Sequence, residues 1–120
     1  MATALWVALG GAVGSLARYA LAGSINMRVQ PWGTVTVNVL GSLVLGVLIG
    51  LWGFHADTSM RVGIAIGLLG GFTTFSSFTI DTIWLWEQGQ AGVAVSSVAI
   101  SVVIGLGAAI LGIVVGRALA

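Results

Sequence analysis

The chain has no cysteine, a single proline and very few charged residues. Its 120 residues include four arginines, three acidic residues and one histidine, so that charged residues make up only 6%. Soluble domains typically carry about 25% charged residues, so this composition excludes a soluble globular fold. The lack of cysteine excludes a disulfide framework and a thiolate metal site. Because 58% of the residues are hydrophobic, we predict an integral membrane protein.

Long apolar segments occupy most of the chain, at residues 4–24, 33–53, 61–86 and 92–116. Each is long enough for a membrane-spanning helix, which needs about 20 mainly apolar residues. The connections are short and polar, and one holds His55 beside Asp57, a pattern typical of a solvated loop rather than a metal site. The start of the chain lacks the positive charge of a secretory signal, so we expect its first segment to be retained. The sequence predicts one all-α transmembrane domain over residues 1–120, with no part outside the membrane large enough for catalysis.

The third apolar segment contains the most informative motif. A glycine pair and four hydroxyl residues interrupt its apolar run, in the order Gly70-Gly71-Phe72-Thr73-Thr74-Phe75-Ser76-Ser77-Phe78. In hydrocarbon, backbone that leaves a helix is tolerated only where it packs against protein or lines a wet cavity. The motif therefore predicts a third helix broken near Gly70 and Gly71, with carbonyl groups free to hold a small cation. Tight helix packing by small residues is the alternative interpretation.

The arginines divide evenly between the two sides of the predicted bundle. Arg61 and Arg117 fall on the side of the N-terminus, whereas Arg18 and Arg28 fall on the opposite side. Orientation in a membrane follows the asymmetry of basic residues in short loops. A chain without this asymmetry is able to insert both ways up, which favours antiparallel pairing; chance balance in so small a set is the alternative.

Glycines recur four residues apart in every predicted span. They are Gly10 and Gly14, Gly46 and Gly50, Gly63 with Gly67 and Gly71, and Gly112 and Gly116. This spacing leaves a smooth helix face on which a second helix packs closely, and we expect most of these glycines to pack within one chain. Because four helices enclose little space, a symmetric homodimer is the expected assembly.

Asn38 is a polar residue about one turn inside the second span, and Thr34 lies on the same helix face four residues earlier. Neutral donors replace the hydration shell of an anion without holding the ion as tightly as arginine does. The pair is therefore a candidate for an anion pathway. Interhelical hydrogen bonding is the alternative.

Phe75 and Phe78 project from one face if the helix resumes after the break, with Ser76 and Ser77 beside them. The edge of a phenyl ring is electropositive and favours a small anion modestly, while the ring excludes bulk water. The alternative is that both rings simply face lipid or pack against other helices.

Three further polar positions have open interpretations. Arg18, in the first span, either reaches the interface or faces a wet vestibule where it raises the local anion concentration. Ser97 and Ser101 share a face of the fourth span and either continue a polar track or bond back to their own helix. Asp81, near the end of the third span, is expected to form an interfacial salt bridge or to carry a proton.

Three motifs in this order resemble the Fluc (CrcB) family of microbial fluoride channels. They are the third-span motif, the run from Gly10 to Tyr19, and the run from Gly33 to Asn38. The resemblance covers nearly the full length. It implies an antiparallel, dual-topology homodimer with two fluoride pathways in the cell inner (plasma) membrane, which passively exports fluoride and relieves its toxicity. Membrane lipid is a further expected partner, and nucleic acid is not.

The resemblance also implies roles for individual residues. The fluoride pathway would be lined by Asn38, Phe75, Phe78, Ser76, Ser77, Thr34 and Ser101. A structural sodium ion would be held by the backbone carbonyls of Gly70 and Thr73 from both subunits. Ser97 stands where some members have a tyrosine, and Arg18 matches an arginine of the family that we assign to the vestibule.

Two other functions compete with a fluoride channel. A proton-coupled small multidrug transporter is also a compact four-span dimer, but it requires a carboxylate within the membrane, and the first two predicted spans contain none. A non-transporting assembly subunit would need only the glycine faces. We expect a fluoride-selective channel without enzymatic activity.

Overall fold

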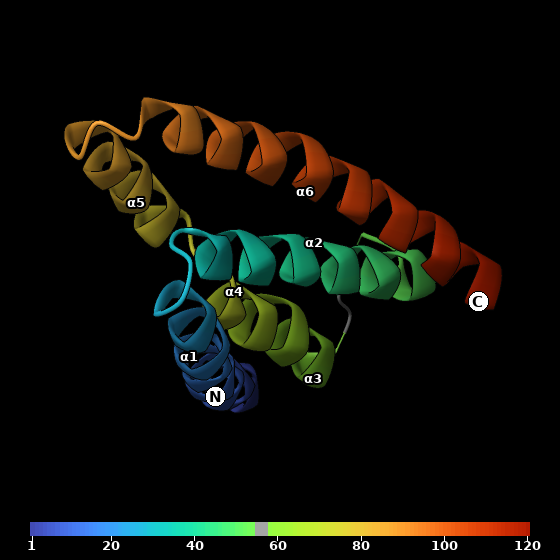
Figure 1. Cartoon of the computed structure of the whole chain (residues 1–120). Coiled ribbons are helices and arrows are strands. Elements are labelled where there is room, and N and C mark those ends of the chain that lie inside the picture. The colour runs from blue at the N-terminus through green and yellow to red at the C-terminus, as the bar shows by residue number, and fades with distance from the viewer. Residues whose placement is uncertain (55–57) are drawn as a thin grey trace.

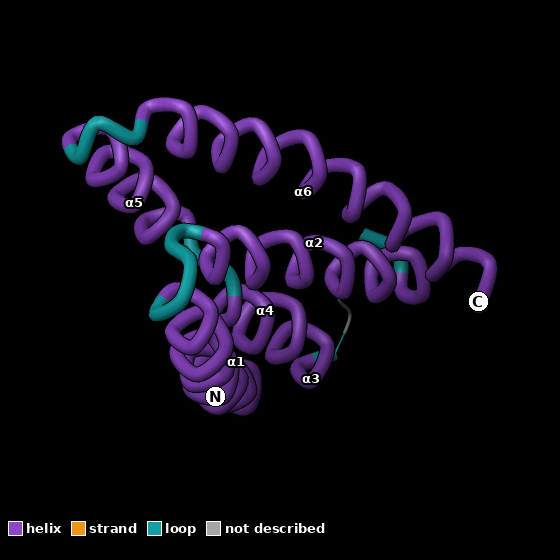
Figure 2. The backbone as a smooth tube through the Cα atoms, viewed as in Figure 1, coloured by secondary structure: helices purple, strands orange, loops and turns teal. Residues whose placement is uncertain are grey.

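The computed structural model describes residues 1–54 and 58–120, which form helices joined by short turns (Figures 1 and 2). Among these residues, four helical segments are long and apolar enough to cross a membrane: Ala2–Asn26, Trp32–Trp52, Ser59–Glu87 and Ala91–Leu119. The prediction of an all-α chain with four membrane-length helices is confirmed. His55 and Asp57 lie outside the described residues.

Three of the four segments are single helices. They are α1 (Ala2–Asn26), α2 (Trp32–Trp52) and α6 (Ala91–Leu119). The third segment is composite: it consists of α3 (Ser59–Val62), a π-helical stretch η1 (Gly63–Leu68), α4 (Leu69–Phe72) and α5 (Phe75–Glu87). Nothing in the sequence pattern indicated the π-helical stretch.

Two helix pairs form the body of the chain. α2 packs along α6, and α1 packs along the first half of the third segment, as Figure 1 shows from one side. Glycines make both contacts close: a side chain at Gly46 would overlap the backbone of Ala109 in α6, and one at Gly10 would overlap the backbone of Gly63. The expectation that the glycine faces pack within one chain is confirmed for these pairs.

The third segment is broken, as predicted, but the break falls at Thr73 and Thr74 rather than at the glycine pair. Thr73 has φ −90° and ψ 159°, and Thr74 has φ −151° and ψ 122°, so both are extended. Extended backbone suits β-branched residues. Gly71 serves a different purpose, because an added Cβ there would lie 2.7 Å from the carbonyl oxygen of Gly11 in α1. The glycine permits close helix approach, and the threonines leave the helix.

After the break, α5 leaves the body of the chain at an angle and packs against α6 and the start of α2 (Figure 1). Much of its apolar surface has no partner within the chain: Phe75 is 77% exposed, Ile80 64% and Trp86 62%. Lipid or a second protein surface must therefore cover this half of the third segment.

Candidate functional site around the broken third helix

Side chains from two other helices satisfy the backbone of the break. The N–H of Thr73 still donates to the Leu69 carbonyl at 3.0 Å, as in a helix. The carbonyl oxygen of Thr73 accepts a hydrogen bond from Nη1 of Arg18 in α1, at 3.1 Å. Arg18 thus lies inside the first span and is directed toward the break.

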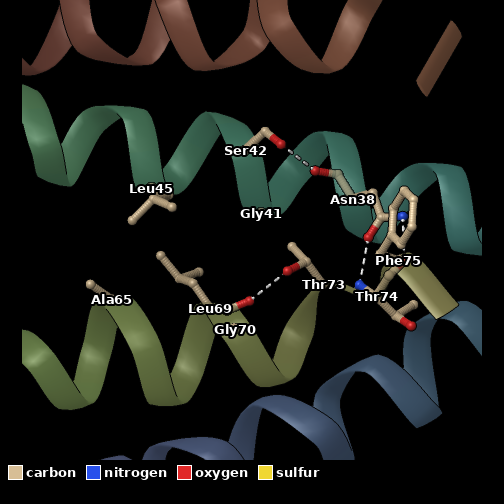
Figure 3. A pocket seen from close by; sticks show the side chains of 10 residues that line it. All are labelled: Asn38, Gly41, Ser42, Leu45, Ala65, Leu69, Gly70, Thr73, Thr74 and Phe75. Atoms are coloured by element: carbon tan, nitrogen blue, oxygen red, sulfur yellow. Dashed lines mark hydrogen bonds between the residues drawn. The ribbon is translucent and has the colours of Figure 1, made fainter. Parts of the chain in front are cut away.

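Asn38 of α2 holds the second residue of the break with two hydrogen bonds. Its Nδ2 donates to the carbonyl oxygen of Thr74 at 2.9 Å, and its Oδ1 accepts the Thr74 N–H at 2.7 Å (Figure 3). The Thr74 hydroxyl in turn accepts the N–H of Ser77 at 3.2 Å and caps the start of α5. The interhelical bonding considered for Asn38 is therefore present, and one N–H of its amide is still available.

A cavity of about 290 Å³ opens beside the break, between α2 and the first half of the third segment; we call it the α2-side cavity. Its lining is Asn38, Gly41, Ser42, Leu45, Ala65, Leu69, Gly70, Thr73, Thr74 and Phe75 (Figure 3). The cavity therefore brings together the predicted pathway residues Asn38 and Phe75 with the predicted cation ligands Gly70 and Thr73.

A second cavity of about 290 Å³, the α1-side cavity, is lined by Ser15, Arg18, Tyr19, Ala22, Gly23, Asn26, Thr34, Thr74, Ser77 and Asp81. It holds an arginine and a carboxylate together with several hydroxyl groups. Thr74 lines both cavities. Arg18 lines this cavity, and its role at a vestibule stays a prediction.

Asp81 lies at the centre of a polar network that joins α5 to the turn between α1 and α2. Its carboxylate accepts a hydrogen bond from the Thr34 hydroxyl at 2.7 Å and one from Nε2 of Gln30 at 3.3 Å. The Thr34 hydroxyl also accepts one from Nδ2 of Asn26 at 3.2 Å. Thr34 is only 3% exposed, and its single hydroxyl hydrogen is directed at the carboxylate.

Sequence reasoning did not find Asn26 and Gln30. Asn26 also accepts the N–H of Gly33 at 2.7 Å, so it ties the end of α1 to the first turn of α2. Polar residues beside a proline turn are common, and nothing in the spacing of Gln30 and Asp81 indicates that they meet. The contact between Gln30 and Asp81 depends on the angle at which α5 leaves the break.

The two phenylalanines adjoin each other, with ring centroids 5.8 Å apart and planes tilted by 41°. Phe75 lines the α2-side cavity. Phe78 lies further along α5, in a narrow pocket that it shares with Thr34, Asp81 and Ser97. Phe75 thus adjoins the α2-side cavity, and Phe78 adjoins the pocket beside Asp81.

The serines have different surroundings. Ser76 and Ser77 are exposed, and Ser77 lines the α1-side cavity. Ser97 is buried and its hydroxyl donates to the Ala94 carbonyl of its own helix at 2.9 Å. The Ser101 hydroxyl is buried without a hydrogen-bond partner among the described residues, so its donor is available. Neither Ser97 nor Ser101 lines the two cavities at the break.

The fold and the site define a class of protein: a four-span membrane protein built around a discontinuous helix, with cavities beside the break that are lined by both polar and apolar residues. Cavities of this kind at a helix break are typical of proteins that move ions or small solutes.

Comparison with known proteins identifies the family. The profile described as "CrcB-like protein, Camphor Resistance (CrcB)" matches residues 5–113, and the chain belongs to this family. A relative from Paracoccus denitrificans (strain Pd 1222), named fluoride-specific ion channel FluC, is 46% identical over 120 residues, which cover 98% of this chain and 96% of the relative. Relatives of the same name from Agrobacterium fabrum and Rhizobium etli (strain CIAT 652) are 42% and 44% identical, and the second alignment covers all of both chains. These names describe ion channels and not enzymes.

Proposed function

We propose that this protein is a fluoride-selective channel that lets fluoride leave the cytoplasm down its gradient, across the inner (plasma) membrane, and so relieves fluoride toxicity. Full-length similarity to proteins named as fluoride-specific channels supports the proposal. The structural observation that carries it is the α2-side cavity, in which the Asn38 amide and the Phe75 ring lie together beside the break.

The chemistry of this cavity suits a small anion that must lose water. The remaining N–H of Asn38 and the electropositive ring edge of Phe75 offer weak, neutral donors in this cavity, and the ring of Phe78 adjoins that of Phe75. Neutral donors let an ion leave as readily as it enters, which conduction requires. Ser76, Ser77, Thr34 and Ser101 are proposed to continue the pathway, with Arg18 attracting anions at the vestibule. Thr34 contributes as a donor only when it is released from Asp81.

A second copy of the chain is the proposed cover for α5. Phe75 is 77% exposed in the single chain, and Gly70 is exposed beside it with no atom within 4 Å of an added Cβ. An antiparallel homodimer would cover this surface twice and create two equivalent pathways. The even division of the arginines supports insertion in both orientations.

The backbone at the break fits the proposed structural sodium ion. The N–H of Thr74 donates to Asn38 and not to the Gly70 carbonyl, which therefore lacks its helical donor. The Thr73 carbonyl has one bond from Arg18 and retains a second lone pair. Gly70 and Thr73, from each of two subunits, would hold the ion, which supplies positive charge that binds the two broken helices together. Carbonyl oxygens suit a hard monovalent cation.

Fluoride efflux from vesicles tests the proposal. Purified protein is reconstituted into liposomes loaded with potassium fluoride, and release is followed with a fluoride electrode after potassium conductance is opened with valinomycin. We expect rapid electrogenic release that protein-free liposomes do not show. Chloride-loaded liposomes are the selectivity control, and equal release of both anions would contradict the proposal.

Asp81 is the feature that a proton-coupled transporter would use, because it is a carboxylate inside the third segment. Its bonds to Thr34 and Gln30 give it a structural use instead. We expect an imposed proton gradient not to drive fluoride uphill in the same liposomes. Uphill movement that Asp81→Asn abolishes would favour the transporter.

A further inference from the structure

Asn38 and the backbone of Thr74 form a closed pair of hydrogen bonds, with lengths of 2.9 Å and 2.7 Å (Figure 3). Turning the amide by half a rotation would place donor against donor and acceptor against acceptor, so the two backbone groups fix its orientation. The two residues lie 36 positions apart in the sequence. Neither bond depends on an ion.

The Thr74 N–H is the group that would otherwise continue the helix. In an α-helix each N–H donates to the carbonyl four residues earlier, which for Thr74 is the carbonyl of Gly70. Thr73 still makes such a bond, to Leu69. Thr74 is therefore the first residue whose N–H leaves the helical pattern, because Asn38 accepts it. Gly70 is in turn the first residue whose carbonyl lacks its helical donor.

We propose that Asn38 is a positioning residue that holds the third helix open and thereby leaves the Gly70 carbonyl available to a small cation. Asn38 would then act on the cation site through Thr74, in addition to any direct contact with an anion. The cation part of this inference rests on the sodium site proposed above. The backbone part rests only on the two hydrogen bonds.

Two substitutions separate this role from that of an anion donor. Asn38→Leu has nearly the same size but neither accepts nor donates, so the Thr74 N–H is free to return to the Gly70 carbonyl. Asn38→Asp still offers an oxygen to the Thr74 N–H whether or not the carboxyl is protonated; when ionised it loses the bond to the Thr74 carbonyl and repels an anion. Ser42→Ala is the matched control, because Ser42 lines the same cavity but donates only to the Asn38 carbonyl oxygen within α2.

The first measurement is the change in thermal unfolding temperature of the full-length protein when sodium replaces N-methylglucamine, in fluoride-free buffer. We expect wild type, Asn38→Asp and Ser42→Ala to show the sodium-dependent rise and Asn38→Leu to lose most of it. A full rise in Asn38→Leu overturns the inference. Loss of the rise in Asn38→Asp to the same degree as in Asn38→Leu overturns it as well.

The second measurement uses the wild-type protein and does not depend on a variant that folds. Amide hydrogen exchange of Thr74 should be about tenfold slower or more than that of Phe75, whose N–H begins α5 and has no helical acceptor. Equal exchange overturns the role of Asn38. Slow exchange of Thr74 shows that its N–H is bonded, and the absence of a sodium effect on wild-type unfolding overturns the cation site. Failure of the proposed channel function shows separately, as absent fluoride release.

Discussion

Arg18 donates from Nη1 to the carbonyl oxygen of Thr73 at 3.1 Å, so a charged side chain of α1 holds the point at which the third segment leaves its helix. Asn38 holds the next residue, Thr74, from α2 on the other side. Two extended residues at membrane depth are thereby satisfied from two helices, as hydrocarbon requires of backbone that is not helical.

Loss of the Arg18 bond should weaken the fold more than loss of a surface arginine. For Arg18→Gln we expect a decrease of about 1.5–3 kcal/mol in the free energy of unfolding, typical of a hydrogen bond to a charged group. Denaturant unfolding in detergent measures the change. Arg28→Gln is the control, because Arg28 is exposed in the turn after α1. Equal effects of the two substitutions would show that the Thr73 contact contributes nothing.

Thr34→Val should be more harmful than Thr36→Val, although the two substitutions are chemically the same. Thr34 donates to Asp81 of α5, whereas Thr36 donates to the Trp32 carbonyl of its own helix. Valine at position 34 leaves the Asp81 carboxylate without its shorter bond, and we expect a loss of about 1–3 kcal/mol in stability. Thermal unfolding of both variants side by side checks this prediction. An equal loss in the two variants would show that the bond between Thr34 and Asp81 does not contribute to stability.

The broken helix is an example of what the sequence does predict. Few polar residues interrupt the third segment, and hydroxyls beside a glycine pair within an apolar run signal irregular backbone in the membrane. The break nevertheless lies a few residues after the glycine pair, at Thr73 and Thr74. Glycine permits an irregular backbone but does not require it, and at Gly71 the missing side chain is used for contact with Gly11.

The partners of the break were less predictable than the break itself. Asn38 was expected to offer donors to an anion or to bond between helices, and the second of these is present. Its partner in both bonds, however, is the backbone of Thr74, 36 positions away, and no local pattern encodes such a distance. The contact of Gln30 with Asp81 was missed for the same reason, since it depends on the angle at which α5 leaves the break.

Phe75→Ile and Phe78→Ile are expected to reduce fluoride release while the protein stays folded. Isoleucine is apolar and of similar bulk, but it lacks the electropositive ring edge. Phe75 is exposed in the single chain, so its replacement leaves packing within the chain nearly unchanged. Release from liposomes, together with the elution volume in size exclusion, measures both effects. Normal release in the double variant would remove the rings from the mechanism.

Leucine at Gly70 should separate assembly from folding. An added Cβ at Gly70 meets no atom within 4 Å in the single chain, whereas one at Gly41 would overlap the Thr73 methyl group. We expect Gly70→Leu to remain helical but to lose self-association, and Gly41→Leu to unfold at lower temperature. Circular dichroism and mass photometry in detergent distinguish the two outcomes. A dimeric and active Gly70→Leu variant would refute a partner at this position.

Selectivity is the central claim, and the reversal potential of the reconstituted protein in a planar bilayer tests it most directly. Equal concentrations of fluoride and chloride face each other across the membrane, so the reversal potential reports the ratio of the two permeabilities. We predict a reversal potential far from zero, with the sign expected when fluoride carries the current. A reversal potential at zero would mean equal permeabilities and would contradict the account.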